Sequence, residues 1–117
     1  MIDCGGTVMD ELQQMKSLTN YECSIEKCLN VIGGKWSFLV LRELFCGKRR
    51  FGELKSCIHG ISPKSLAQTL RHLEENGIVV REAHATIPPT VEYDLTKKGH
   101  TLHDIIIEMK KWGTYWA

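Results

Sequence analysis

The segment from Ser62 to Gly77 is bounded more sharply than any other part of the chain. At its start, the Ser62 hydroxyl can accept an unpaired backbone amide, and Pro63 is favoured at the first position of a helix. At its end, Asn76-Gly77 is typical of a left-handed helix stop. Three leucines recur at helical spacing between these signals: Leu66, Leu70 and Leu73. The segment therefore predicts a helix over 62–76 with one buried face.

Further apolar patterns flank this helix on both sides. Three segments with apolar residues at helical spacing precede it: 23–32, 36–46 and 51–58. After it, two strands are expected at Ile78–Val80 and Val91–Leu95, joined by a proline-containing loop. A long helix is expected from about Lys97 to Trp116.

The order of these elements favours one architecture. The expected order is helix, helix, helix-turn-helix, two-stranded hairpin and helix. A winged helix-turn-helix has this order, and such a domain belongs to the α+β fold class with mainly α content. A generic α+β domain could show the same order by chance. A chain of 117 residues suits a single hydrophobic core. We expect one domain over 21–117, including the long C-terminal helix, and an N-terminal arm over 1–20 that is helical in part.

Positive charge is concentrated in one region. The net charge of the chain is only +1. Residues 46–72 hold a single acid, Glu53, against six basic residues: Lys48, Arg49, Arg50, Lys55, Lys64 and Arg71. An ordinary solvated surface would intersperse the two signs, so this segment predicts an electropositive patch.

The outward face of the 62–76 helix has side chains that suit the major groove of DNA. Lysine and arginine can donate to guanine, glutamine can pair with adenine, and serine can bond a base or a phosphate. We predict base contacts from Lys64, Ser65, Gln68, Arg71 and His72. The alternative is the solvated side of an ordinary amphipathic helix. The preceding short helix, the tight turn and the nearby basic residues favour DNA. Phosphate contacts are predicted from Lys48, Arg49, Arg50, Lys55 and Ser62.

Seven short motifs in order span about residues 21–116. They are Cys23–Lys27, Val31–Trp36, Leu41–Leu44, Arg50–Leu54, Gly60–Leu66, Leu73–Gly77 and Pro88–Thr96. Together they resemble the HxlR family. The resemblance implies a bacterial, MarR-like, homodimeric regulator of transcription, with the 62–76 helix in the major groove of a pseudo-palindromic operator and the hairpin at the minor groove. It also implies that terminal helices form the dimer interface, which agrees with the apolar stripe Leu102, Ile105, Ile106, Met109, Trp112 and Trp116.

The chain departs from the family pattern at two positions. Ser24 stands where family members commonly have proline, and Thr90 stands where many have a basic residue after the paired prolines. The second departure leaves Arg81 and His84 as the nearer candidates for a hairpin contact with DNA.

The chain has five cysteines, and none of their spacings forms a C-x-x-C pair. We therefore expect no zinc site, and the sequence indicates no other metal and no cofactor. Cys23 is expected at a helix cap, where unpaired amides and the helix dipole favour a thiolate. In the resembled family, some members use this cysteine to sense electrophiles or oxidants. Cys23 is the sensor candidate, with Cys57, Cys46 or Cys4 of a second subunit as disulfide partner. The alternative is an inert thiol packed against that subunit.

Two other classes of function were weighed against DNA binding. A winged helix can serve as a protein-interaction module, but the exposed polar face of the 62–76 helix argues against that alternative. A thiol enzyme is not expected, because no histidine is placed near Cys23 and no glycine-rich phosphate loop is present. The chain has no apolar run of membrane-spanning length and no secretory signal, so we expect a cytoplasmic protein without membrane contact.

Overall fold

The computed structural model describes the backbone of residues 21–117 and the side chains of residues 24–117. The chain divides into two units, Met1–Ile32 and Gly33–Ala117. In the first unit the structure describes helix α2, Tyr21–Ile32. The predicted arm over 1–20, which includes Cys4, lies outside the described residues. Cys23 falls inside α2 rather than at its cap, because Tyr21 and Glu22 are already helical.

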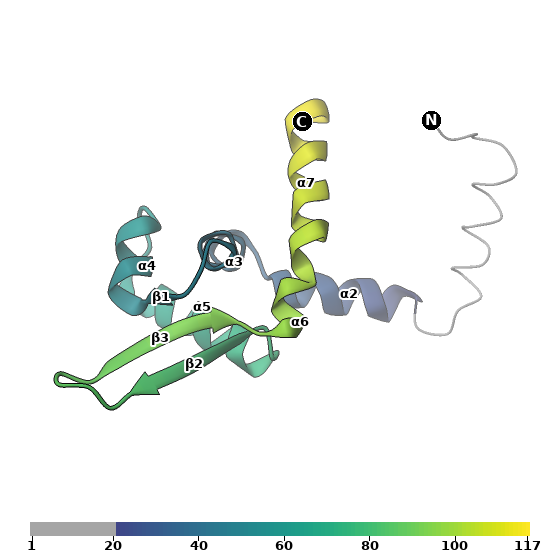
Figure 1. Ribbon diagram of the computed structural model, residues 1–117. Helices are drawn as coiled ribbons and strands as arrows, with labels where there is room; N and C mark the ends of the chain where they lie inside the picture. Colours follow the sequence, from purple (N-terminus) through teal and green to yellow (C-terminus); the bar gives the residue numbers. More distant parts are fainter. Residues whose placement is uncertain (1–20) are drawn as a thin grey trace, which may run out of the picture. The chain divides into compact units, whose positions relative to one another are not determined.

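The second unit contains five helices and a small antiparallel sheet (Figure 1). Helices α3 (Lys35–Phe45), α4 (Phe51–Cys57) and α5 (Pro63–Glu75) come first, with strand β1 (Arg49–Arg50) between α3 and α4. Strands β2 (Val79–His84) and β3 (Thr90–Leu95) form a hairpin, and the strand order is β1-β3-β2. Helices α6 (Lys97–His100) and α7 (Leu102–Trp116) follow.

The core of this unit lies between the three-helix cluster and one face of the sheet. Its largest fully buried side chains come from α3, α4, α5 and the segments that join them: Leu41, Leu44, Leu54, Ile58, Ile61, Leu66, Leu70, Leu73, Ile78 and Val40. Tyr93 and Leu95 of β3 are also buried. The predicted inward face of the 62–76 helix is therefore confirmed.

Both predicted ends of α5 are confirmed. The Ser62 hydroxyl accepts a hydrogen bond from the Ser65 amide at 3.0 Å, and Pro63 occupies the first turn. Gly77 has a φ of 73°, which glycine adopts at low steric cost. These local signals position the exposed face of α5.

The sheet is larger than the sequence predicted. Strand β2 continues to His84 instead of ending at Val80, and β1 adds a third strand that the sequence analysis missed. In the register, Tyr93 of β3 lies between Arg49 of β1 and Arg81 of β2. A two-residue strand is too short to show alternation, so only its pairing with β3 defines it.

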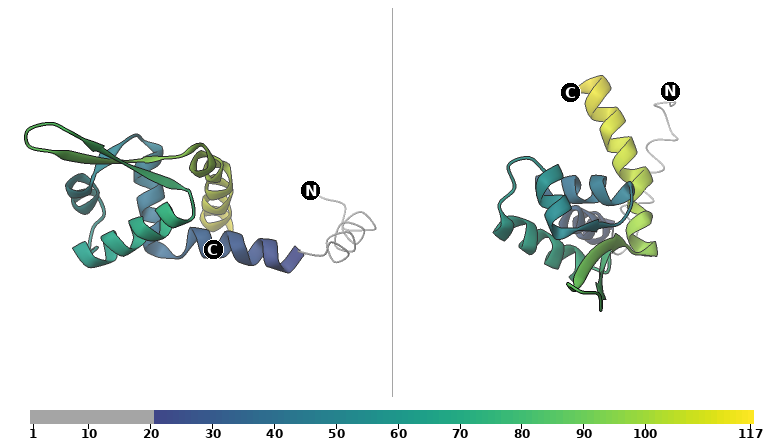
Figure 2. Two further views of the ribbon diagram at one scale, coloured as in Figure 1. Left: turned by 90° about the horizontal axis from the view of Figure 1, so that it is seen from below. Right: turned by 60° about the vertical axis from the view of Figure 1, so that its left-hand side comes forward.

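The predicted helix from Lys97 to Trp116 is divided at Thr101. Gly99 is buried against the main chain at Ile78, where a Cβ atom would collide with the Ile78 carbonyl oxygen. This contact ties α6 to the end of the hairpin. Helix α7 then leaves the body of the unit, and its second half projects away from it (Figures 1 and 2).

The apolar stripe on the last helix is divided between the core and the surface. Leu102 and Ile106 are buried within the chain, whereas Ile105, Met109, Trp112 and Trp116 are exposed. Among the described residues, none of the helices has the length and apolar character needed to cross a membrane.

Candidate nucleic-acid interface

The exposed face of α5 holds the central base-contact candidates. Lys64, Gln68 and Arg71 are exposed, and Ser65 and His72 at the margins are partly buried. Their spacing of three to four residues places Lys64, Gln68 and Arg71 along one side of the helix, opposite the leucines. The structure therefore brings together three long polar side chains on one exposed surface.

Most backbone amides at the amino end of α5 are missing or already paired. Of its first four residues, Pro63 has no N–H. The Ser65 amide donates to the Ser62 hydroxyl, and the Leu66 amide donates to the Ser62 carbonyl at 2.9 Å. The Lys64 amide is the remaining backbone N–H of this turn that can bind an anion.

Ser62 and Ser65 are also linked through their side chains. The Ser62 hydroxyl donates to the Ser65 hydroxyl at 3.0 Å. Ser65 still has its own hydroxyl proton to donate, so a contact with a base or phosphate remains compatible with the cap.

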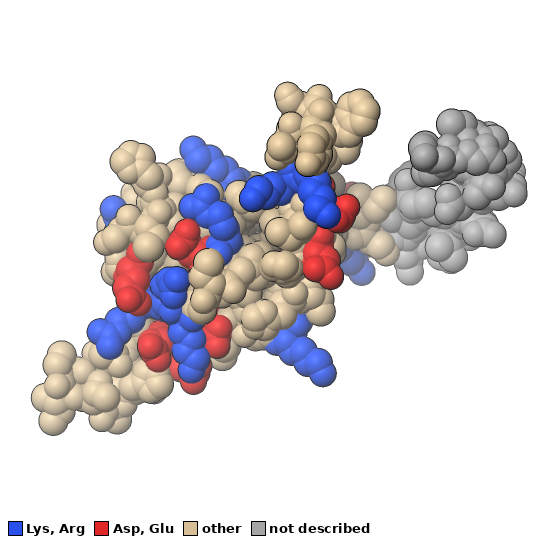
Figure 3. Space-filling view, turned by 45° about the horizontal axis from the view of Figure 1, so that its top comes forward, with Lys and Arg blue, Asp and Glu red and all other residues tan. Residues whose placement is uncertain are grey.

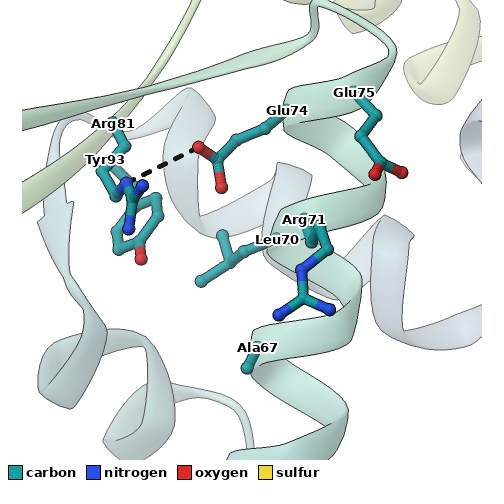
Figure 4. Close-up of a pocket in the computed structure, with 7 residues that line it drawn as sticks. All are labelled: Ala67, Leu70, Arg71, Glu74, Glu75, Arg81 and Tyr93. Carbon is teal, nitrogen blue, oxygen red and sulfur yellow. Dashed lines mark ion pairs between the residues drawn. The ribbon is translucent and has the colours of Figure 1, made fainter.

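A hollow of about 430 Å³ separates α5 from the hairpin (Figure 4). It is lined by Ala67, Leu70, Arg71, Glu74 and Glu75 of α5, with Arg81 and Tyr93 from the hairpin. Glu74 forms an ion pair with Arg81 across it, with Oε1 and Nε 3.7 Å apart. The hollow thus has one guanidinium on the helix and another on the hairpin.

Three of the predicted DNA-contact residues are paired with carboxylates of the chain. Besides Arg81 with Glu74, Lys48 Nζ lies 3.5 Å from Glu82, and His84 Nε2 lies 2.7 Å from Glu92. Within the predicted patch over 46–72, Lys48 is thus paired with an acid of the hairpin, and Arg71 lines the hollow together with Glu74 and Glu75. Figure 3 shows the two signs side by side on the face that it draws. These pairs were not predicted from the sequence, because each one joins residues of different elements that only the fold brings together.

The remaining basic candidates lie around β1 and α4. Arg50 is exposed, and Arg49 and Lys55 are partly buried. The Arg50 amide donates to Glu53 at 2.7 Å, which secures the start of α4. Arg49 donates to the Lys48 carbonyl at 2.9 Å, which fixes its side chain close to the main chain.

Three of the five cysteines have side chains that the structure describes, and these three are free thiols. Cys46 and Cys57 are exposed, Cys28 is partly buried, and the Cys23 side chain lies outside the described residues. Cys57 lies on the rim of a hollow of about 490 Å³ beside Arg49 and Arg50. Within the described part of the chain, no group of three or more His, Cys, Asp or Glu residues could hold a metal ion.

A polar-faced helix preceded by a short helix and a tight turn, and followed by a β-hairpin, defines a winged helix-turn-helix DNA-binding domain. The family model that matches residues 31–117 is the HxlR-like helix-turn-helix. Since it covers most of the chain, the protein belongs to the HxlR-like family of transcriptional regulators.

Similar proteins agree with this assignment. The uncharacterized HTH-type transcriptional regulator sll1512 of Synechocystis is 44% identical over 98 residues, 84% of this chain and 73% of its own length. The redox regulator HypR in its reduced form has 43% identity and a TM-score of 0.74, over 78% of this chain and 90% of HypR. Reduced YodB from Bacillus subtilis has 35% identity and a TM-score of 0.75, over 80% of this chain and 92% of YodB.

These findings confirm the predicted fold class and the predicted class of function. The protein is an HTH-type regulator of transcription and not an enzyme. The alternative of an interaction module without DNA binding is therefore not retained.

Proposed function

We propose that the protein binds a pseudo-palindromic double-stranded operator as a homodimer, with one α5 in each of two successive major grooves. The division of α5 into a buried leucine face and an exposed polar face supports this most directly. Arg71 and Lys64 would donate to guanine and Gln68 would pair with adenine. Ser65 and His72 are the marginal base contacts.

The basic residues around α5 would bind phosphates and so position the helix. They are Lys48, Arg49, Arg50, Lys55, Ser62, Arg81 and His84. Three of them already have carboxylate partners, but an exposed ion pair is worth only about 0–1 kcal/mol. A DNA phosphate can therefore replace or share such a partner at little cost.

The operator can be sought with the protein itself by selection from a random duplex library. Two half-sites of inverted sequence, with centres about 34–36 Å or one helical turn apart, are expected for a two-fold dimer. Binding should weaken steeply as salt rises, because phosphate contacts release counterions. Selection of a single half-site without an inverted repeat would contradict the dimeric arrangement.

The dimer would use the exposed part of the apolar stripe on α7. Ile105, Met109, Trp112 and Trp116 form an apolar surface of the kind that marks protein contacts. Leu102 and Ile106, which were predicted with them, are buried in the chain and would support this surface from behind.

We further propose that DNA binding is switched by oxidation of Cys23, with an electrophile or oxidant as the signal. The similarity to HypR, described as a redox regulator, and to YodB, also solved after diamide treatment, supports this proposal. In the cytoplasm, where we place the protein, thiols are mostly reduced, so their oxidation can act as a signal. Cys23 lies in the first described turn of α2. A thiolate near the amino end of a helix is stabilised by the helix dipole.

The proposed switch is a disulfide between two subunits. Two thiols would lose two protons and two electrons to the oxidant, and an S–S bond would form from Cys23 to Cys57, Cys46 or Cys4 of the partner. The exposure of Cys46 and Cys57 makes both accessible for this reaction. Such a link would rotate one subunit against the other and change the separation of the two α5 helices.

This switch can be tested with hypochlorite or a quinone on the wild type and on Cys23→Ser. Wild-type affinity for the selected duplex should change on oxidation and recover with reductant, and a dimer band should form under non-reducing conditions. Cys28→Ser serves as a matched control on the same helix. Equal responses from wild type and Cys23→Ser would remove Cys23 as the sensor.

A further inference from the structure

The end of the hairpin differs in chemistry from the rest of the proposed DNA-binding surface. Residues 85–91 between His84 and Glu92 contain no charged side chain. Figure 3 shows the corresponding end of the molecule, at lower left, without Lys, Arg, Asp or Glu. Its most prominent side chain is Ile87, which is fully exposed at 101% of its reference area.

The tip is also poor in hydrogen-bond donors. Pro88 and Pro89 have no backbone N–H, and the Thr86 hydroxyl donates to the Pro88 carbonyl at 2.7 Å. The nearest ionisable side chains, His84 and Glu92, are paired with each other across the base of the tip. The tip therefore offers an apolar surface and has no charged side chain that could bind a phosphate.

The length of the hairpin fits the spacing of the grooves of DNA. Arg81 faces α5 across the hollow, and Ile87 is six residues further along, so at about 3.3 Å per residue it lies up to about 20 Å away. The centre of an adjacent minor groove is half a turn, or about 17 Å, from the major groove that would hold α5. The tip can thus meet the minor groove while α5 occupies the major groove.

We propose that Ile87 makes an apolar contact with the floor of the minor groove and selects A·T over G·C pairs there. This inference rests on the proposed placement of α5. In the minor groove, G·C differs from A·T by the guanine N2 amino group. That group would project into the space of Ile87 and lose its water without gaining an acceptor, which is unfavourable.

The test compares three base pairs at one position of the duplex selected by the wild-type protein. The position is half a helical turn outside each major-groove half-site. An inosine·cytosine pair has the minor groove of A·T but the major groove of G·C. Full-length protein should bind the A·T and inosine·cytosine duplexes alike, and the G·C duplex roughly tenfold more weakly.

Three variants make the test specific to the tip. Ile87→Ala should lose the discrimination between inosine·cytosine and G·C while keeping the preferences of the major-groove positions. Ile87→Arg should bind all duplexes more tightly at low salt, because it adds a phosphate contact. The slope of log affinity against log salt concentration should become steeper by about one released counterion. Val80→Ala truncates an exposed apolar residue of β2 outside the tip and should behave like wild type.

Several results would overturn the inference. One is that the wild type binds the G·C and inosine·cytosine duplexes with equal affinity. Another is that Ile87→Ala still discriminates between these two duplexes as the wild type does. A third is that Val80→Ala loses this discrimination as well. Those outcomes leave the proposed function intact, since the major-groove preferences are measured separately. Failure of the wild type to select any sequence would overturn both the proposed function and this inference.

Discussion

Helices α5 and α7 are both amphipathic, but their exposed faces differ in chemistry. Helix α5 buries all three of its leucines and exposes lysine, glutamine and arginine. Helix α7 buries only Leu102 and Ile106 and leaves two tryptophans, Trp112 and Trp116, 64% and 78% exposed. The apolar surface of α5 is completed within the chain, whereas that of α7 is not.

Because of this difference, each of the two helices suits a different kind of partner. A polar exposed face loses little by staying in water and can bind an anionic partner when one is present. An apolar exposed face gains free energy when it is covered, so it favours a second protein surface. The same periodicity of apolar residues therefore leaves a polar face suited to DNA on one helix and an apolar face suited to a protein partner on the other.

The largest expected effect comes from the buried side of α5. Leu70→Ala should lower the free energy of unfolding by roughly 2–5 kcal/mol, because it opens a cavity in the fully buried core. Urea denaturation followed by circular dichroism measures this. Gln68→Ala on the exposed side of the same helix is the control and should change stability by less than about 0.5 kcal/mol. Similar losses in both variants would refute the division of α5 into two faces.

The second effect tests the exposed face of α7. Trp112→Ala should weaken subunit association by about 2 kcal/mol or more, since buried tryptophans are frequent hot spots of protein interfaces. Sedimentation equilibrium at micromolar concentration should show the shift from dimer to monomer. Lys111→Ala, on another side of α7 and paired with Glu108 at 3.3 Å, should leave the dimer unchanged. A wild-type protein that is monomeric at these concentrations would contradict the proposed interface.

The contrast also explains which elements could be predicted from the sequence. Helix α5 was predicted with both ends because Ser62, Pro63 and Gly77 act through local hydrogen bonds and backbone angles. Strand β1 and the division between α6 and α7 were missed, because they depend on contacts with residues distant in sequence.

The candidate site was predictable in part for the same reason. The outward residues of α5 follow from helical geometry alone. The carboxylates that pair with Lys48, Arg81 and His84 do not, since folding brings the hairpin beside α5 and β1 and sets the register of its two strands. The unequal burial along α7 was missed too, because a regular apolar stripe does not indicate where the body of the domain ends.

The third effect separates two kinds of contact around α5. Arg71→Ala should reduce discrimination between the selected and random duplexes by roughly 1–3 kcal/mol, because it removes a base contact. Arg50→Ala should weaken binding to both duplexes equally and reduce the salt dependence by about one ion. Fluorescence anisotropy titrations at several salt concentrations measure both quantities. Identical behaviour of the two variants would show that Arg71 does not contact bases.

The smallest expected effect concerns the ion pair that links α5 to the hairpin. Glu74→Gln removes a carboxylate beside Arg71 and Arg81 while keeping the size of the side chain. Stability should change by less than about 1 kcal/mol, because the Glu74–Arg81 pair is partly exposed to solvent. Affinity for all duplexes should rise a few-fold at low salt, since a negative charge near the phosphates is lost, and this gain should shrink as salt screens it.

Glu108→Gln on α7 removes a carboxylate on the other helix and should leave DNA binding unchanged. A weaker affinity in Glu74→Gln, restored by Glu74→Asp, would mean instead that Glu74 aligns Arg81 for its contact and that this alignment outweighs the repulsion.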